Sequence, residues 1–117
     1  MTNEIDSAPD GRKELDPEEL FRRVAKEGER LDEEWIETCY DIVRDEGQVV
    51  GQHDWDSGGP GAGAGTDCVY LFRGVFIADD DTGCFGPYET FAEAAKAIDL
   101  FTKTSATTSI WVAPEFK

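Results

Sequence analysis

The sequence predicts an α+β fold: a small antiparallel or mixed sheet of four to five strands, with two N-terminal helices and one C-terminal helix packed on it. Two helix-start signatures, at Asp16 and Thr90, each open an amphipathic pattern. Apolar runs of strand length lie between these helices and after them. Because helices and strands do not alternate strictly along the chain, an antiparallel or mixed sheet with helices on one face is favoured over a doubly wound parallel sheet.

The expected domain organisation follows from length and composition. The chain has 117 residues, 39% of them hydrophobic, which is enough for one core and too little for two. Residues 1–14 combine Pro, Gly, Asn, Asp and Ser with few apolar side chains, so we expect them to form a disordered tail. Residues 15–117 are then expected to form a single domain.

The N-terminal helical region contains two start signals and two stop signals. Asp16 is followed by Pro and two Glu, which is typical of a capped helix start, and Gly28 is expected to end that helix. Asp32 offers a second cap, and Gly47 a second stop. Two helices are therefore preferred over residues 17–46, although one continuous bent helix fits the pattern nearly as well.

The strands are predicted on either side of a Gly-rich loop over residues 56–66, whose small side chains cannot pack. Residues 69–72 and 75–78 are apolar runs that flank Arg73 and Gly74, which predicts a tight hairpin or one long bulged strand. Further strands are predicted over 48–52, 84–88 and 109–113.

The C-terminal helix is predicted to begin at a capping box. The hydroxyl of Thr90 can accept a hydrogen bond from the backbone of Glu93, whose side chain can reach back to Thr90. At about 100° per residue, the apolar side chains that follow share one face. They are Phe91, Ala94, Ala95, Ile98 and Phe101.

The charge of the chain restricts its partners. Twenty-six acidic residues against 11 basic ones give a formal net charge of −15, and no basic stripe could neutralise a run of phosphates, so we expect no binding to nucleic acid and none to an anionic membrane. No apolar run approaches the roughly 20 residues of a membrane-spanning helix, and the N-terminus lacks the apolar stretch of a signal peptide. A cytoplasmic location is expected.

The sequence shows no recognisable catalytic machinery. Its three cysteines, Cys39, Cys68 and Cys84, are odd in number and too widely spaced for a disulfide framework or a Cys-x-x-Cys metal site. Nucleophilic catalysis would need a neighbouring base, and His53 is the single histidine. We therefore expect a protein that is not an enzyme, with no catalytic residues, no cofactor and no metal site.

The favoured functional hypothesis is an acidic domain that binds a basic protein partner, as small inhibitor or immunity proteins do. Glu33, Glu37 and Asp41 share one face of the second predicted helix, where like charges cost helix stability and a basic partner would relieve the repulsion. Trp55, which is followed by Asp56 beside the Gly-rich loop, is an aromatic anchor suited to a cationic surface. These five residues are the predicted partner-binding set.

The alternative hypothesis is a small enzyme, or a ligand-binding or metal-binding domain, with its site beside the Gly-rich loop. His53, Asp54, Asp56 and Asp67 would supply its polar groups. A third interpretation is that the charge is an adaptation to a salty cytoplasm. The sequence makes no prediction of the oligomeric state.

Overall fold

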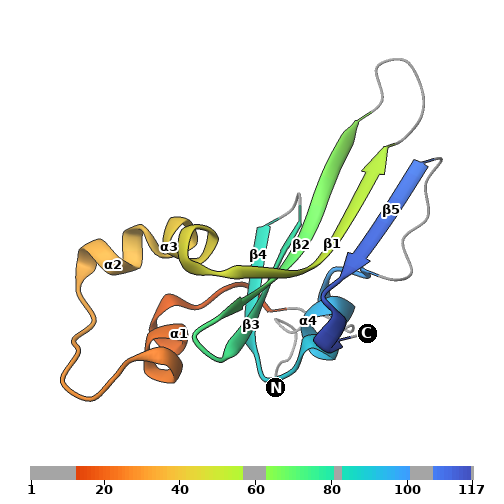
Figure 1. Ribbon diagram of the computed structural model, residues 1–117. Coiled ribbons are helices and arrows are strands. Elements are labelled where there is room, and N and C mark those ends of the chain that lie inside the picture. Colours follow the sequence, from red (N-terminus) through yellow and green to blue (C-terminus); the bar gives the residue numbers. More distant parts are fainter. Residues whose placement is uncertain (1–12, 57–62, 81–82, 101–106, 117) are drawn as a thin grey trace, which may run out of the picture.

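A computed structural model of the chain describes residues 13–56, 63–80, 83–100 and 107–116 (Figure 1). It confirms the predicted α+β fold, as a five-stranded sheet with helices packed against it. The strands are β1 (Gln48–Asp56), β2 (Ala64–Phe72), β3 (Val75–Asp80), β4 (Gly83–Tyr88) and β5 (Thr107–Val112). The helices are α1 (Pro17–Val24), α2 (Glu33–Glu37), α3 (Cys39–Glu46), α4 (Phe91–Ala97) and a 3₁₀ turn at Pro114–Phe116.

The sheet has the order β4-β3-β2-β1-β5, and each neighbouring pair in this order is antiparallel. The first four strands therefore follow one another across the sheet. After them the chain passes through α4 and returns to the far edge, where β5 pairs with β1. None of the described helices is long and apolar enough to cross a membrane.

Helices cover both faces of the sheet, so the expectation that they pack on one face is wrong. On one face, side chains of α1 and α3 such as Leu20 and Val43 pack with Ile77 of β3. On the other face, α4 contributes Phe91, which packs with Phe76 of the same strand (Figure 1). Burial of β3 on both faces explains why its sequence is a continuous apolar run rather than an alternating pattern.

The second predicted helix is divided at Thr38 into α2 and α3. The Thr38 hydroxyl donates a hydrogen bond to the carbonyl oxygen of Glu34 (2.8 Å), and the Thr38 backbone N–H donates to the same oxygen (3.0 Å). A threonine that bonds back to the preceding turn bends a helix. The cap predicted at Asp32 is present, since its carboxylate accepts a hydrogen bond from the backbone of Trp35 (2.7 Å).

The first helix is shorter than expected. It ends at Val24, with Ala25 already extended (ψ 144°), rather than near Gly28. A separate turn competes for the following residues, since the Glu29 N–H donates to the carbonyl of Lys26 and Gly28 adopts a φ of 93° within that turn. The stop expected at Gly28 therefore belongs to a turn outside the helix.

Glycine is required for different reasons at two turns next to the strands, Gly74 and Gly47. Arg73 and Gly74 both have positive φ angles, 48° and 88°, which confirms a two-residue hairpin between β2 and β3 rather than one bulged strand. Gly47 ends α3 as predicted, but with an extended backbone. A Cβ there would lie 2.4 Å from the carbonyl oxygen of Val43 and 3.2 Å from the Cβ of Tyr70, so space requires this glycine.

The strands next to the Gly-rich segment are longer than predicted. β1 continues from residue 48 through Asp56, and β2 already begins at Ala64, so both ends of the loop predicted over 56–66 are strand. Residues 57–62 lie outside the described part of the chain. The polar residues after Gln52 carry no alternating apolar pattern, and the pairing of β1 with two neighbours holds them extended.

The N-terminal end of the described chain lies along β4. Glu14 forms an isolated bridge with Phe85, Leu15 donates to the carbonyl of Cys84 (3.0 Å), and the N–H of Gly86 donates to the carbonyl of Lys13 (3.1 Å). Residues 1–12 of the tail predicted over 1–14 lie outside the described residues. The segment 13–15 thus covers the outer edge of β4.

The capping box at the start of α4 supports a first prediction. Thr90 accepts from the backbone of Glu93 (3.1 Å), and the Glu93 carboxylate accepts from the Thr90 N–H (3.1 Å). Thr90→Ala is expected to lower the free energy of unfolding by about 1 kcal/mol, measured by urea denaturation. Thr90→Ser is the matched control, because serine keeps the hydroxyl that accepts from Glu93. Equal losses in both variants would contradict the role of the box.

Candidate protein-binding surface

The exposed side of α2 and α3 carries a continuous set of carboxylates. We call it the acidic surface and define it as Glu33, Glu34, Glu37, Asp41 and Asp45, all of which are exposed. Four of the five members lie four residues apart along the chain, Glu33 and Glu37 in α2, and Asp41 and Asp45 in α3. Within each helix, this spacing keeps the two side chains close on one side.

The opposite side of α2 and α3 is fixed by packing. Trp35 packs edge-to-face on Phe21 of α1, with ring centroids 5.4 Å apart. Cys39 and Val43 are fully buried in the core against the sheet. Because these side chains anchor the helices, the carboxylates of the acidic surface are held toward the solvent.

The acidic surface lacks neutralising partners within the described chain. Glu33, Glu34, Glu37 and Asp45 make no ion pair with another described residue. Asp41 makes one ion pair, in which its Oδ1 lies 3.9 Å from Nη1 of Arg44. The Asp41 side chain nevertheless stays 84% exposed. This surface therefore keeps most of its negative charge uncompensated.

Several carboxylates elsewhere in the described chain are paired, although others, such as Glu27 and Glu115, make no ion pair with a described residue. Glu19 lies 3.1 Å from the Lys13 ammonium and 3.2 Å from the Arg23 guanidinium. Asp79 accepts from Nε of Arg44 at 3.2 Å, and this hydrogen bond is the main cause that raises the pKa of Arg44. Arg44 is thus engaged with the sheet more closely than with the acidic surface.

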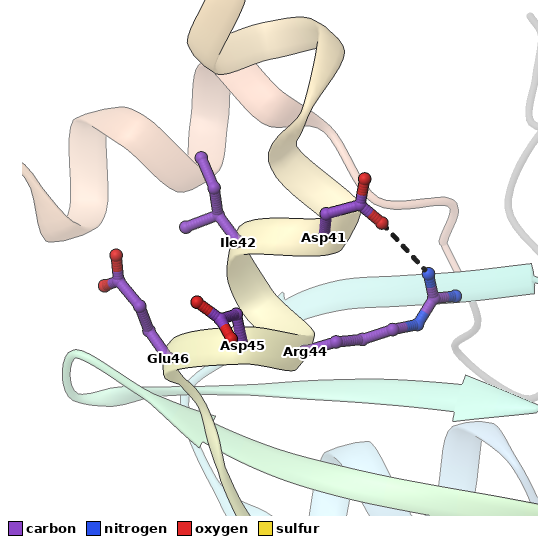
Figure 2. Close-up of a pocket in the computed structure, with 5 residues that line it drawn as sticks. All are labelled: Asp41, Ile42, Arg44, Asp45 and Glu46. Atoms are coloured by element: carbon purple, nitrogen blue, oxygen red, sulfur yellow. Dashed lines mark ion pairs between the residues drawn. The ribbon is translucent and has the colours of Figure 1, made fainter.

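An open depression of about 460 Å³ lies beside α3 (Figure 2). It is lined by Asp41, Ile42, Arg44, Asp45 and Glu46. Figure 2 shows the Arg44 side chain extending away from the helix with its guanidinium toward Asp41, while Ile42 and Glu46 project on the other side. The depression thus combines one apolar side chain, three carboxylates and the Arg44 guanidinium, and one of these carboxylates, Glu46, is paired with Arg73 (3.2 Å).

The structure separates the two halves of the predicted partner-binding set. Glu33, Glu37 and Asp41 lie on α2 and α3, whereas Trp55 and Asp56 form the last two positions of β1. Figure 1 places that end of β1 on the opposite side of the molecule from α2. One flat contact with both groups would have to extend across the whole sheet, so they do not form one compact site.

The alternative site is brought together only in part. His53 and Asp67 face each other across β1 and β2, both are fully buried, and His53 Nδ1 lies 3.9 Å from Asp67 Oδ2. Neither imidazole nitrogen has a hydrogen-bond partner among the described residues. Asp54 is exposed on the other face of the sheet, where its carboxylate accepts from Gln52 and Thr66. The side chain of Asp56 lies outside what the structure describes.

The described residues contain no group of three or more His, Cys, Asp or Glu side chains placed to hold a metal ion. The cysteines are also poor nucleophiles. Burial raises the pKa of Cys39 to about 11 and that of Cys84 to about 12, and it also raises the pKa of the half-buried Cys68. Because the thiolate is the reactive form, all three groups are protonated and weakly reactive at neutral pH.

Sequence reasoning missed three large apolar side chains that the fold leaves exposed. Tyr40 on α3 is 39% exposed, and Ile110 and Trp111 on β5 are 43% and 48% exposed. The apolar run at 110–112 predicted a strand but not its place at a sheet edge, which depends on pairing with β1.

In comparisons with protein-family models, curated proteins and solved structures, nothing matches this chain.

Proposed function

We propose that this protein is a non-enzymatic binding domain whose acidic surface docks on a basic protein, in the manner of a small acidic inhibitor. The observation that carries the proposal is the cluster of five exposed carboxylates on α2 and α3, of which only Asp41 makes an ion pair within the described chain, at 3.9 Å. What distinguishes this surface is the clustering of its carboxylates, since single unpaired ones such as Glu27 also occur elsewhere.

The energetics of the helices support this assignment. Like charges four residues apart destabilise a helix by about 0.2 to 0.5 kcal/mol per pair. Two such pairs are present, Glu33 with Glu37 in α2 and Asp41 with Asp45 in α3, so the isolated domain carries a cost that contact with a basic surface would reduce. A concentrated negative field also steers a positively charged partner into encounter.

The remaining polar groups support binding rather than catalysis. The described thiols have raised pKa values, and His53 is fully buried beside Asp67. A general base must reach its substrate through hydrogen-bond contact. Neither the thiols nor the imidazole offers an activated group at the surface.

The first experiment identifies the partner. The full chain, tagged, would be used to retain proteins from a lysate of its own organism at low salt, followed by elution at high salt and mass spectrometry. We expect a basic protein that is released as salt screens the attraction. Binding that resists high salt would contradict an electrostatic contact.

The second experiment localises the contact by charge reversal. Glu37→Lys combined with Asp45→Lys is expected to slow association with the purified partner by about tenfold and to flatten its salt dependence. Glu33 and Asp41 are left unchanged because a carboxylate in the first turn stabilises α2 and α3 through the helix dipole. Stopped-flow association rates over a salt series provide the measurement.

The matched control is Glu27→Lys combined with Glu115→Lys. Both residues are exposed, neither makes a described ion pair, and the pair changes the net charge by the same amount. It should slow association much less, since the total field is equally reduced but the acidic surface is intact. Equal slowing by the two double variants would show that only the overall charge matters and would overturn the docking site.

A further inference from the structure

The two edge strands of the sheet, β4 and β5, differ in whether another segment covers their outer side. The β4 edge is covered by the segment 13–15, and it also contains Pro87, which cannot donate a backbone hydrogen bond. Among the described residues, β5 pairs only with β1. Free edges of this kind attract other strands, and proteins usually protect them with charge or proline.

The free backbone groups of β5 follow from the ladder with β1. The Ala113 N–H donates to the Val50 carbonyl (2.9 Å), and these residues continue the β1–β5 register. In an antiparallel ladder, bonded and non-bonded pairs alternate, so Trp111 and Ser109 bond toward β1. The N–H and C=O groups that point to the open edge belong to Thr108, Ile110 and Val112.

The side chains of β5 lack the usual protection. Its sequence, Thr-Thr-Ser-Ile-Trp-Val, contains no charged residue and no proline, in a chain of which 32% is charged. Ile110 is exposed on the α4 side of the sheet, where it pairs with His53. Trp111 is exposed on the other side. Within the described residues, the strand thus offers backbone groups without a partner strand, flanked by an exposed apolar side chain on each face.

We infer that a second copy of this chain pairs with β5, antiparallel and about a two-fold axis, to form a continuous ten-stranded sheet. One register uses every outward backbone group. It pairs Ile110 with Ile110 of the second copy, and Thr108 with Val112 of the second copy. The same register sets each Trp111 opposite Ser109 of the other copy, so both exposed apolar side chains become covered.

The lack of charge on β5 favours pairing with a second copy of this chain over pairing with the basic partner proposed above. A strand that recognised a basic segment should carry carboxylates, as the acidic surface does, whereas β5 is neutral. Two copies with the same net charge can approach each other only where the contact surface carries no charged side chains. On the neighbouring strand β1, Asp54 lies opposite Ser109, and its carboxylate accepts hydrogen bonds from Gln52 and Thr66.

Salt dependence gives the first test, and its sign differs from that of the proposed function. Two copies with a charge of −15 each repel, so dimerisation should tighten between about 0.1 M and about 1 M NaCl. Binding to a basic partner should weaken over the same range. Sedimentation velocity of the full chain, from about 10 to about 300 µM, would measure the dimer.

Variants place the contact on the edge. Ile110→Lys sets two ammonium groups opposite each other and should weaken the dimer at least about tenfold. Thr108→Pro removes one outward N–H and leaves the bonds to β1 unchanged, and it should weaken the dimer similarly. Tyr40→Lys is the control, because it makes the same change in charge at an exposed aromatic of α3. Circular dichroism would confirm that each variant folds.

Three results would overturn the inference. One is a monomer at every concentration and salt. Another is a dimer that Ile110→Lys and Thr108→Pro leave intact while both variants stay folded. The third is a monomer whose complex with a basic partner is lost on Ile110→Lys, which would place that partner on the edge. Loss of the dimer with retained partner binding would support both assignments independently.

Discussion

Phe72→Ala is expected to lower the free energy of unfolding by about 3 to 5 kcal/mol. Phe72 ends β2, is only 1% exposed, and is among the largest fully buried side chains of the described residues. It packs in the cluster that joins Leu20 of α1 and Val43 of α3 to the sheet. Its removal leaves a cavity where three elements meet. For a small domain, this loss is a large fraction of the total stability.

Urea denaturation followed by circular dichroism would measure this loss. Phe21→Ala deletes the same atoms from a half-buried ring that contacts Trp35 at the edge of α1. A smaller loss of about 1 to 2 kcal/mol is expected there, since less apolar area is buried. Similar losses at both positions would show that the cluster around Phe72 is not the centre of this core.

The folded protein is also expected to lose stability between about pH 9 and pH 12. Burial raises the pKa of Cys39 from 9.0 to about 11 and that of Cys84 from 9.0 to about 12. Below pH 9 both thiols are protonated in the folded and unfolded states, so stability is complete. Above pH 9 the unfolded chain ionises first and binds fewer protons, so the free energy of unfolding falls.

Each thiol is expected to lower the free energy of unfolding by about 1.4 kcal/mol per pH unit above pH 9. The total loss is on the order of 3 kcal/mol for Cys39 and 4 kcal/mol for Cys84. Burial also raises the pKa of Tyr70, to about 12, and adds to the same trend. Urea denaturation at several pH values under reducing conditions would measure it. Cys39→Ala combined with Cys84→Ala should flatten most of the slope. A parallel decline in wild type and variant would contradict the assignment.

Helix starts were predictable because their signals are local. Asp16, Asp32 and Thr90 each stand beside the backbone N–H groups that they cap, and the structure confirms all three. The break at Thr38 was not predicted, since a threonine that bonds back to the previous turn looks in sequence like any other helical residue. Its effect depends on geometry rather than on residue type.

The full extent of β1 could not be predicted from its sequence. After Val50 the strand contains Gln52, His53 and Asp54, which resemble a loop. Their extended conformation comes from pairing with β2 on one side and with the distant β5 on the other. The burial of His53 beside Asp67 has the same origin. Tertiary pairing overrides local propensity at these positions.

The candidate surface was predictable in part. Periodicity placed Glu33, Glu37 and Asp41 on one face, and the structure shows them exposed. Strand order determines how far these residues lie from Trp55 and whether Trp111 is exposed. Neither feature could be predicted from the local sequence. The charge pattern is a local property, whereas the neighbours of a strand are set by the whole chain.

The pairing of the last strand with the first has a consequence for the growing chain on the ribosome. Strands β1 to β4 are synthesised before α4, which covers one face of the sheet, and before Thr107–Val112, which pair with one side of β1. Until both have emerged, that face and that side of β1 lack these partners, so we expect the sheet to be completed only when the last strand is synthesised.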